Sequence, residues 1–309
     1  MIDITLLGTA ALFPIPKRAL TTAFLTCGGH AILFDCGEGT QTAARRADVN
    51  LMKVDIIALT HYHGDHIFGL PGLFQTLSNL ERTEPLYVTG PAGLQKAMEP
   101  ILKLAWQTSY EIKLIEIPQD GLKLCDLVKG WAYEAKLSAF PTEHRIVSQG
   151  YCFTLGRAGK FQPDKAQALN IPITQWSILQ KGQSVQVGDE IILPNQVLGE
   201  PRKGLKFIFS GDTTFCESLV DAAKGADLMI CEATFGENEE EEVAIRHGHM
   251  TFAQAAKTAK LADVKKLWLA HYSHKIMNPQ EYLPNATAIF ENTICGRDCM
   301  STTLKFEED

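Results

Sequence analysis

The sequence predicts an α/β fold in which outer helices enclose two central mixed β-sheets. Short apolar or β-branched segments alternate with helical segments, and this alternation occurs in both halves of the chain. A stretch rich in Gly, Pro, Gln and Lys at 156–204 separates the two halves. Alternating strands and helices pack as sheets covered by helices, so we expect a single domain over 1–309 with 156–204 inserted into it.

The first half opens with short strands broken by glycine pairs. Gly37, Glu38 and Gly39 begin a helix, and the compact apolar segment DIIALT is a buried strand that runs straight into HYHGDH. Pro71 and Gly72 are candidate breaks in the helix that follows. We expect strands at 2–7, 22–27, 31–35, 55–60, 85–89, 131–140 and 150–155, and helices at 37–47, 66–80 and 91–105.

The insertion at 156–204 has weak hydrophobic periodicity, so we expect it to have little core of its own. Regular structure resumes after it. We expect strands at 205–210, 227–231, 266–270 and 301–306, and helices at 213–224, 251–262 and 279–291. The acidic run at 237–242 is interpreted as the solvated first turn of a helix, where carboxylates complement the helix dipole.

Composition and charge indicate a cytoplasmic globular protein. Hydrophobic residues make up 45% of the chain, no run of about 18 apolar residues predicts a membrane span, and the N-terminus lacks the basic region of a signal peptide. The eight cysteines show no zinc-binding spacing, and several lie in apolar runs, as thiols in a reducing compartment do. A net charge of −7 argues against nucleic-acid binding through overall charge, while leaving room for a local basic patch.

Four side chains that can bind a metal lie within six residues, directly after the strand at 55–60. They are His61, His63, Asp65 and His66. His61 and His63 alternate in an extended segment and can face the same way, and Gly64 allows a reversal after which the other two face a second ion. Imidazole and carboxylate ligands suit zinc, manganese or iron better than calcium. A chance cluster of surface histidines is the alternative, which the density of the motif disfavours.

Two metal ions need more ligands than this motif supplies. Three further donors lie at or just past the ends of apolar strands: His144, Asp212 and His271. Each alone could be structural, but three at strand ends favour convergence on one site. Two ions about 3.5–4 Å apart would activate a bridging water and stabilise charge on the attacking and leaving oxygens. Asp65 is placed both to bind an ion and to take the remaining proton of that water.

The motif HxHxDH with a downstream His, Asp and His resembles the signature of the metallo-β-lactamase superfamily. Further blocks resemble ribonuclease Z, the family of tRNA 3′-processing endonucleases, and together they span most of the chain: FDCGEGTQ (34–41), LTHYHGDHIFGLPGL (59–73), FSGDT (209–213), CEATF (231–235) and HMTFAQAA (249–256). The resemblance implies the αββα sandwich of that superfamily. It also implies an endonuclease that cuts the 3′ trailer from precursor tRNA and leaves 3′-hydroxyl and 5′-phosphate ends.

The resemblance implies two divalent ions, with zinc expected and manganese or iron as alternatives. The implied ligands are His61, His63 and His144 for one ion and Asp65, His66 and His271 for the other, with Asp212 bridging them. Asp65 is also implied as a catalytic residue.

The resemblance also assigns roles outside the ligand set. Glu232 and His249 match the family's Glu–His pair, which helps to protonate the leaving ribose oxygen. Taken alone, His249 could cap the helix at 251–262 and Glu232 could be a buried ion-pair partner. Ser273 and Lys275 follow the last ligand, where the family contacts substrate phosphate.

The insertion resembles the flexible arm with which the family clamps the elbow of tRNA. Its cations offer a surface for phosphate binding, and a solvated loop is the alternative: Arg157, Lys160, Lys165, Lys181, Arg202 and Lys203. The resemblance further implies a homodimer in which the arm of one subunit serves the other. The early loop reads PIPKRA (14–19) where the family has PxKxRN, and Cys231 replaces a His, which bears on recognition of the tRNA 3′ end more than on phosphodiester cleavage.

Three other functions are considered. A general phosphodiesterase, or a thioester, lactone or β-lactam hydrolase of the same fold, would share the ligands but lack the arm and the Glu232–His249 pair. A di-iron oxidoreductase generally replaces the second His of the motif by Glu and adds a flavin domain, whereas this chain has His63. A non-catalytic RNA-binding or scaffold protein would have no need for seven buried polar donors.

Overall fold

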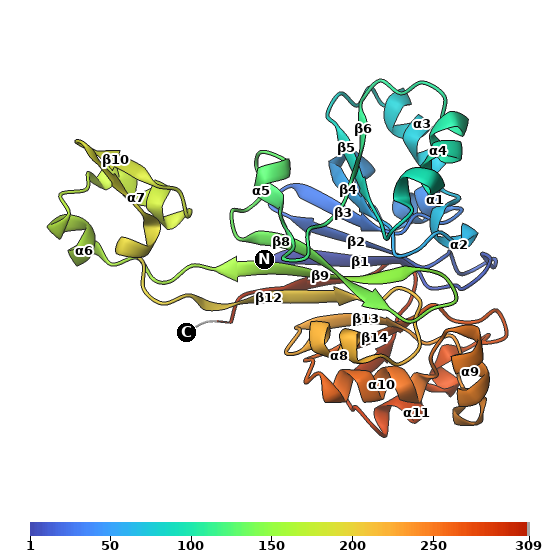
Figure 1. Cartoon of the computed structure of the whole chain (residues 1–309). Coiled ribbons are helices and arrows are strands. Elements are labelled where there is room, and N and C mark those ends of the chain that lie inside the picture. The colour runs from blue at the N-terminus through green and yellow to red at the C-terminus, as the bar shows by residue number, and fades with distance from the viewer. Residues whose placement is uncertain (308–309) are drawn as a thin grey trace.

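Two seven-stranded β-sheets lie face to face at the centre of the structure, a computed structural model that describes residues 1–307 (Figure 1). The strand order of the first sheet is β16 (Met300–Leu304), β1 (Ile2–Gly8), β2 (Thr22–Cys27), β3 (His30–Phe34), β4 (Val54–Ala58), β5 (Leu86–Thr89) and β6 (Ile112–Ile115). The order of the second is β15 (Thr293–Cys295), β14 (Leu267–Ala270), β13 (Leu228–Glu232), β12 (Arg202–Phe209), β9 (Ser148–Arg157), β8 (Ala135–Thr142) and β7 (Leu122–Lys123).

Both sheets are mixed in the same way. In the first sheet β3, β4, β5 and β6 run parallel, and in the second β12, β13, β14 and β15 do. The remaining neighbours in each sheet are antiparallel. The carboxyl ends of the parallel strands therefore form a common edge in each sheet, where loops can carry functional side chains.

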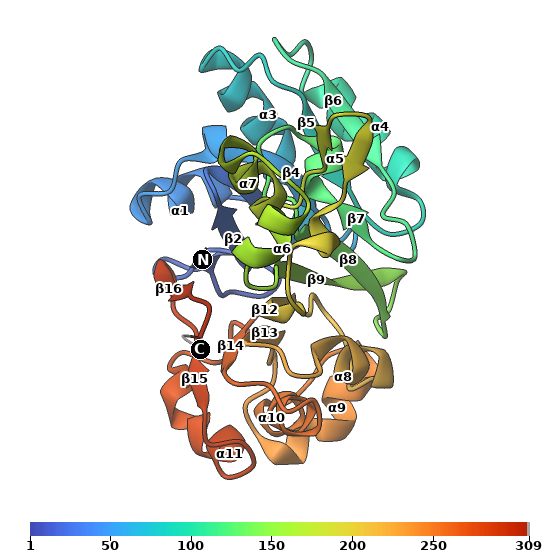
Figure 2. The same ribbon diagram turned by 90° about the vertical axis from the view of Figure 1, so that its left-hand side faces the viewer.

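Helices cover the outer face of each sheet, which gives four layers (Figure 2). The first sheet packs against α1 (Thr40–Arg46), α3 (Leu70–Asn79) and α4 (Leu94–Leu104), and the second against α8 (Glu217–Ala223), α10 (Phe252–Leu261) and α11 (Leu283–Thr287). Shorter elements are η1 (Leu51–Lys53), α2 (Gly64–Ile67), α5 (Leu124–Leu127), η3 (Asn238–Glu240) and α9 (Glu241–His247). The αββα sandwich predicted from the sequence is confirmed.

The apolar strands are buried on both faces. In β3, Ile32 and Phe34 point into the core between the sheets, whereas Ala31 and Leu33 point toward the helices. Because successive side chains of a strand alternate between faces, a strand covered on both sides needs a continuous apolar run. That is why the segment AILF reads as apolar throughout.

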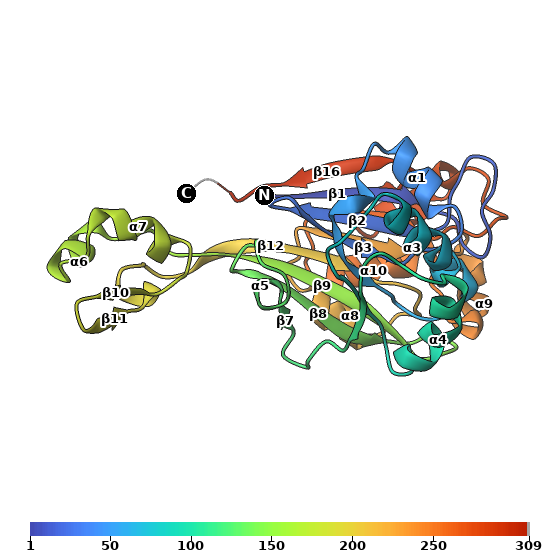
Figure 3. The same ribbon diagram turned by 90° about the horizontal axis from the view of Figure 1, so that it is seen from above.

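The insertion projects from the ends of β9 and β12 as a separate lobe (Figures 1 and 3). It contains α6 (Pro163–Ala168), α7 (Ile173–Gln180), the hairpin of β10 (Val185–Val187) and β11 (Glu190–Ile192), and the short η2 (Pro194–Gln196). The expectation that it has little core of its own is wrong. Six residues form a buried cluster inside it: Ala166, Ile171, Leu179, Val185, Ile192 and Val197. Elements this short show too few turns for a hydrophobic period to be recognised.

The remaining differences from the predicted elements are local. The helix expected at 66–80 breaks at Phe68 and Gly69, not at Pro71, and at the break the N–H of Gly69 donates to the Cys36 carbonyl at 2.9 Å instead of to a partner within the helix. Pro71 instead lies in the first turn of α3, where its missing N–H costs nothing. The helix expected at 279–291 is only η4 (Pro279–Glu281) and α11. The strands β6, β7 and β15 and the helix α5 were not predicted.

Within residues 1–307 there is no helix that combines the length and the apolar character needed to cross a lipid bilayer.

Candidate metal centre

The predicted donors converge where strands of the two sheets end. His61 follows β4, Asp212 follows β12 and His271 follows β14, each at the carboxyl end of a parallel strand. His144 lies in the turn between β8 and β9. Overlapping groups of these side chains have their ligand atoms within 4.8 Å of one another. The structure therefore brings all seven predicted donors, up to 210 positions apart in sequence, into one cluster.

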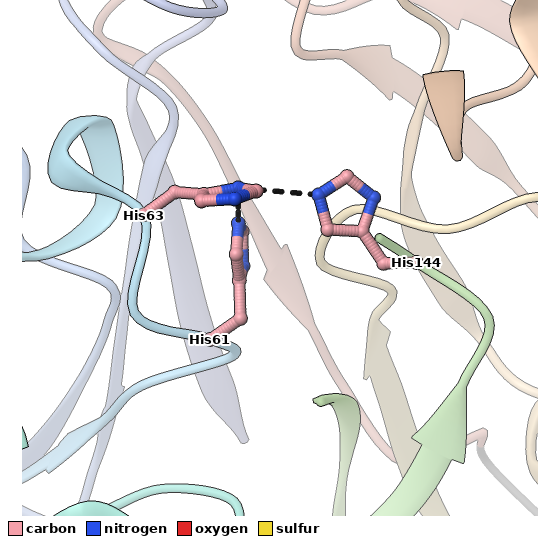
Figure 4. A group of neighbouring side chains, drawn as sticks. All are labelled: His61, His63 and His144. Carbon is pink, nitrogen blue, oxygen red and sulfur yellow. Dashed lines mark hydrogen bonds between the residues drawn. The ribbon is translucent and has the colours of Figure 1, made fainter. Parts of the chain in front are cut away.

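Three imidazoles, from His61, His63 and His144, face one another (Figure 4). Nε2 of His61 lies 3.0 Å from Nδ1 of His63, and Nε2 of His144 lies 3.2 Å from the same Nδ1. Three imidazole nitrogens directed at a common point form the ligand set of many zinc sites.

Asp212 lies between this group and a second one formed by Asp65, His66 and His271. Its Oδ1 is 3.2 Å from Nε2 of His271, whereas its Oδ2 is 3.4 Å from Nε2 of His66 and 3.7 Å from Nε2 of His61. Oδ2 of Asp65 is 3.5 Å from Nε2 of His66 and 3.7 Å from Nε2 of His271. The two oxygens of Asp212 thus face both groups, as a bridging carboxylate requires.

A buried carboxylate, Asp35, orients the motif from behind. Its Oδ2 lies 2.8 Å from Nδ1 of His66, and it also accepts hydrogen bonds from the N–H and the hydroxyl of Thr60. The Thr60 hydroxyl in turn lies 3.0 Å from Nδ1 of His61. Contacts of this kind fix the ring orientation and leave the other nitrogen of each ring for the cluster.

The two histidines from later in the chain are held in the same manner. Nδ1 of His144 lies 2.7 Å from the carbonyl oxygen of Gly248, and Nδ1 of His271 lies 3.0 Å from the Thr234 hydroxyl. His271 also adopts a positive φ of 60°, a conformation that non-glycine residues keep only where the surroundings impose it.

The unpaired atoms of the cluster fit a metal ion. Nε2 of His66 and Nε2 of His271 are buried and have no hydrogen-bond partner within residues 1–307. Because an unsatisfied buried nitrogen costs free energy, their common direction points to a ligand. Burial lowers the pKa of three other histidines and so favours the neutral imidazole that binds metals: His61, His63 and His144. Five imidazoles and two carboxylates suit zinc, with manganese and iron as alternatives.

The two carboxylates are ionised despite their burial. Burial raises the pKa of Asp65, but the nearby imidazoles of His271 and His66 outweigh it and hold the pKa below its usual range. Burial likewise raises the pKa of Asp212, but the charges of His271 and His66 outweigh this effect and hold the pKa well below its usual range. Both groups are therefore available as anionic ligands at neutral pH.

Glu232 and His249 form a buried pair beside the cluster. Nδ1 of His249 lies 2.8 Å from Oε1 of Glu232, and the other oxygen of Glu232 accepts hydrogen bonds from the N–H and hydroxyl of Thr234. Burial lowers the pKa of His249, but the Glu232 carboxylate outweighs it and raises the pKa to about 9. His249 is thus a cation at neutral pH, 5.1 Å from His144 between ring centroids.

The alternative that His249 caps the following helix is wrong. The residue that caps α10 is Thr251, whose side chain accepts from the N–H of Gln254, while the Gln254 side chain accepts from the N–H of Thr251. The other alternative, that Glu232 is a buried ion-pair partner, agrees with its contact with His249.

A cavity of about 800 Å³ opens beside the cluster. The predicted substrate residues Ser273 and Lys275 both line it, and so does His249. Two residues that the sequence did not single out, Phe13 and Arg145, also line it.

The predicted substrate residues Arg157 and Lys160 do not reach this cavity. They line a second cavity of about 1000 Å³ at the root of the arm, together with Lys181 and Arg202. The Arg157 guanidinium lies 5.2 Å from the centre of the Phe306 ring and donates to the carbonyl of Glu307.

Comparisons with known proteins agree with this geometry. Residues 21–119 match the family model of the metallo-beta-lactamase superfamily, and residues 157–272 match a model described as a beta-lactamase superfamily domain. Ribonuclease Z of Lachnoclostridium phytofermentans is 40% identical over 311 residues, and ribonuclease Z of Clostridioides difficile is 42% identical over 308 residues, with 100% of each chain covered in both cases. The chain belongs to the ribonuclease Z family.

A solved structure supports the same assignment. The crystal structure of human tRNase Z, short form, aligns with 98% of this chain and 100% of its own, with a TM-score of 0.68 and 25% identity. The resemblance to ribonuclease Z inferred from the sequence motifs is therefore confirmed.

Sequence reasoning missed the residues that hold the ligands. Asp35 ends the strand predicted at 31–35 and has a positive φ of 60°, but a single Asp after an apolar run carries no signal of its partner 31 positions later. The sequence gives no signal for Thr234 or for the carbonyl of Gly248 either, because hydroxyls and backbone oxygens are present throughout any sequence.

Proposed function

We propose that this protein is a metal-dependent endoribonuclease that removes the 3′ trailer of precursor tRNA by hydrolysing one phosphodiester at a two-metal centre. Full-length relatives named ribonuclease Z support the substrate and the reaction. The observation that carries the mechanism is the placement of Asp212, whose two oxygens face the two groups of donors.

The proposed ligand sets divide the cluster. His61, His63 and His144 hold one ion, and Asp65, His66 and His271 hold the other, with Asp212 between them. Zinc is the proposed metal, since tetrahedral nitrogen and oxygen sites suit it. When bound, two divalent ions polarise the phosphoryl oxygens and lower the pKa of water so that hydroxide is available at neutral pH.

The proton steps fall to side chains of this chain. Asp65, ionised and beside the cluster, takes the proton of the attacking water. His249 gives a proton to the 3′ oxygen of the tRNA-side ribose as the bond between that oxygen and phosphorus breaks, and Glu232 stabilises the cationic form of His249. The products are a tRNA with a 3′-hydroxyl and a trailer with a 5′-phosphate.

The remaining contacts are proposed to bind RNA. Ser273 and Lys275 line the cavity beside the cluster and are placed to contact phosphate there. Residues 156–204 form an arm within a single domain of 309 residues, and Arg157 and Lys160 at its root contact the tRNA backbone. We also propose a homodimer in the cytoplasm, in which each arm serves the other subunit's site.

The decisive experiment combines metal analysis with a cleavage assay. The purified protein should contain about two zinc, manganese or iron ions per chain and should cut precursor tRNA after the discriminator base, which sequencing of the 3′ ends would show. A chelator should abolish cleavage and added metal should restore it.

Parallel substrates separate the alternatives. Bis(p-nitrophenyl) phosphate, nitrocefin and a thioester should report a general phosphodiesterase, a β-lactamase and a thioesterase. Hydrolysis of nitrocefin or the thioester with precursor tRNA left intact would overturn the proposal. Cleavage of the small phosphodiester alone would reduce it to a general phosphodiesterase.

A further inference from the structure

Phe13 is held in contact with solvent at the rim of the catalytic cavity. Its side chain is 48% exposed, and the centre of its ring lies 5.0 Å from the imidazole of His274, which is also exposed. Both rings line the cavity that contains the metal cluster. Neither side chain has a role in holding the cluster.

The loop that carries Phe13 is fixed, so its exposure is built into the fold. The N–H of Leu12 donates to Oδ2 of Asp65 at 2.9 Å, and the N–H of Ala11 donates to the carbonyl of Tyr272 at 3.0 Å. Leu12 has a φ of +66°, a left-handed conformation that a leucine adopts only where its surroundings impose it. Strained backbone of this kind gathers at functional sites.

A second anchor holds the far side of the same loop. The buried Arg18 donates to the carbonyls of Ile276 and Met277, and the half-buried Asp298 accepts from the N–H of Ala19. The loop is therefore tied to the segment after β14, which carries His274. The two rings are positioned by the same set of contacts.

The ring geometry restricts what this pair can bind. Aromatic rings in contact have centres 4.5–7 Å apart, so at 5.0 Å the two rings already touch and leave no room for a third ring between them. Phe13 nevertheless stays 48% exposed, so part of its ring remains available to a ligand. Flat, unpaired RNA bases stack on exposed aromatic rings of this kind.

The geometry points to a base-binding platform: we propose that Phe13, supported from behind by His274, stacks on the base of the nucleotide next to the scissile phosphate. The inference rests on the proposed nuclease function. The backbone N–H of Leu12 donates to Asp65, so Phe13 follows directly in sequence a residue that contacts the cluster. Because Phe13 and the cluster line one cavity, a nucleotide whose phosphate lies at the cluster has its own base on the side of Phe13.

Fluorescence of 2-aminopurine tests the stacking without cleavage. This base is placed on either side of the scissile bond in a precursor RNA with an uncleavable methylphosphonate at that bond. The metal-loaded wild-type protein should quench one of the two probes, because stacking on an aromatic ring quenches this fluorophore. Phe13→Ala should lose that quenching, whereas Trp106→Ala, which removes an 82% exposed aromatic outside the cavity, should keep it. Equal quenching by wild type and Phe13→Ala would overturn the proposal.

Kinetics with an abasic substrate tests the same contact during turnover. Phe13→Ala should lower kcat/KM on intact RNA by about 5- to 150-fold, the range for loss of one base–aromatic stack. On RNA that lacks the flanking base it should change kcat/KM by less than about twofold. His274→Ala should show a smaller loss with the same dependence on the base, and equal losses on both RNAs would reject stacking.

Failure of this inference is distinguishable from failure of the proposed function. If the wild type leaves precursor tRNA uncut, the nuclease proposal fails, and quenching that depends on Phe13 would still identify the platform. If the wild type cuts precursor tRNA and Phe13→Ala behaves as the wild type does in both assays, only the platform is rejected.

Discussion

The metal cluster and the arm lobe at 161–198 differ in how much of the molecule holds them in place. The cluster draws its donors from strand ends in both sheets, and those sheets share one large core. The lobe has a separate core of six buried residues, continues from β9 and β12, and also packs against the body where Gly182 meets the ring of Tyr133. The difference teaches that the cluster is held independently of the lobe, because none of the contacts that orient its histidines comes from residues 161–198.

The two regions also differ in charge. The lobe contains two lysines against three acidic residues, so its formal charge is −1: Lys165 and Lys181 against Asp164, Asp189 and Glu190. The cations of the insertion gather at its root instead. The surface of the lobe carries exposed apolar side chains instead, such as Ile173 (76% exposed) and Ile191 (67% exposed). By charge, the root of the arm fits the predicted phosphate-binding surface better than the lobe does.

The largest effect is expected from a change inside the cluster. Asp65→Ala removes an anionic donor and leaves the Leu12 N–H without its acceptor. We expect cleavage of precursor tRNA and of bis(p-nitrophenyl) phosphate to fall together by about a thousandfold or more. Circular dichroism should show that the fold is kept. Glu38→Ala is the matched control, since Glu38 is an exposed carboxylate lining the same cavity, and a wild-type rate in Asp65→Ala would refute the mechanism.

Removal of the lobe should separate the two regions most directly. The N–H of Gly199 already donates to the carbonyl of Lys160 at 2.9 Å, so residues 161–198 can be replaced by a short glycine turn. We expect kcat/KM on precursor tRNA to fall about 100-fold through loss of the second attachment point. Hydrolysis of bis(p-nitrophenyl) phosphate should stay within about twofold of the wild type. Equal losses on the two substrates would show that the lobe supports the catalytic site.

Asp35→Asn tests how the residues behind the cluster orient it, because the substitution changes none of the seven predicted metal ligands. The amide keeps the size of the carboxylate but loses the charge that orients His66, so metal affinity should fall about 10- to 100-fold. Competition with a chelating dye measures that affinity, and excess zinc should restore activity. The control is Asp55→Asn, which alters a similar pair with His30 at 2.8 Å, outside the cluster. Unchanged metal affinity in Asp35→Asn would remove Asp35 from the positioning role.

The smallest effect is expected at the root of the arm. Lys160→Ala should weaken tRNA binding a few-fold and reduce the slope of log K against log salt by about one unit, as loss of one phosphate contact does. Lys96→Ala, on the exposed face of α4, should leave both quantities unchanged. An unaltered slope in Lys160→Ala would show that the root of the arm does not contact the RNA backbone.

The sequence predicted the sandwich and the cluster because both leave local signals. The apolar runs of the strands are continuous, and HYHGDH compresses four donors into six positions. His144, Asp212 and His271 could be proposed because each follows an apolar strand. Their convergence depends on the carboxyl ends of parallel strands meeting at one edge, which is a property of topology. The roles of the individual donors stay predictions until a metal is measured.

What the sequence could not predict depends on contacts between distant residues. The positioning role of Asp35 is visible only from its contact with His66. The exposure of Phe13 at the cavity depends on a loop that is fixed by Asp298, 285 positions later. The core of the lobe was missed for a different reason. Its apolar residues come from short helices, a hairpin of two three-residue strands and the loops between them, so each element contributes one buried side chain and no visible period.

The pairing of β1 with β16 joins the two ends of the chain, from Ile2 opposite Leu304 to Leu6 opposite Met300. Residues 300–304 are synthesised after every other strand of the first sheet, so this sheet lacks its edge strand until they have left the ribosome. Asp298, which anchors the loop over Asp65, emerges equally late. The loop over Asp65 therefore lacks this anchor until residue 298 has been made, so the surroundings of the cluster are completed only after all seven predicted metal ligands have been synthesised.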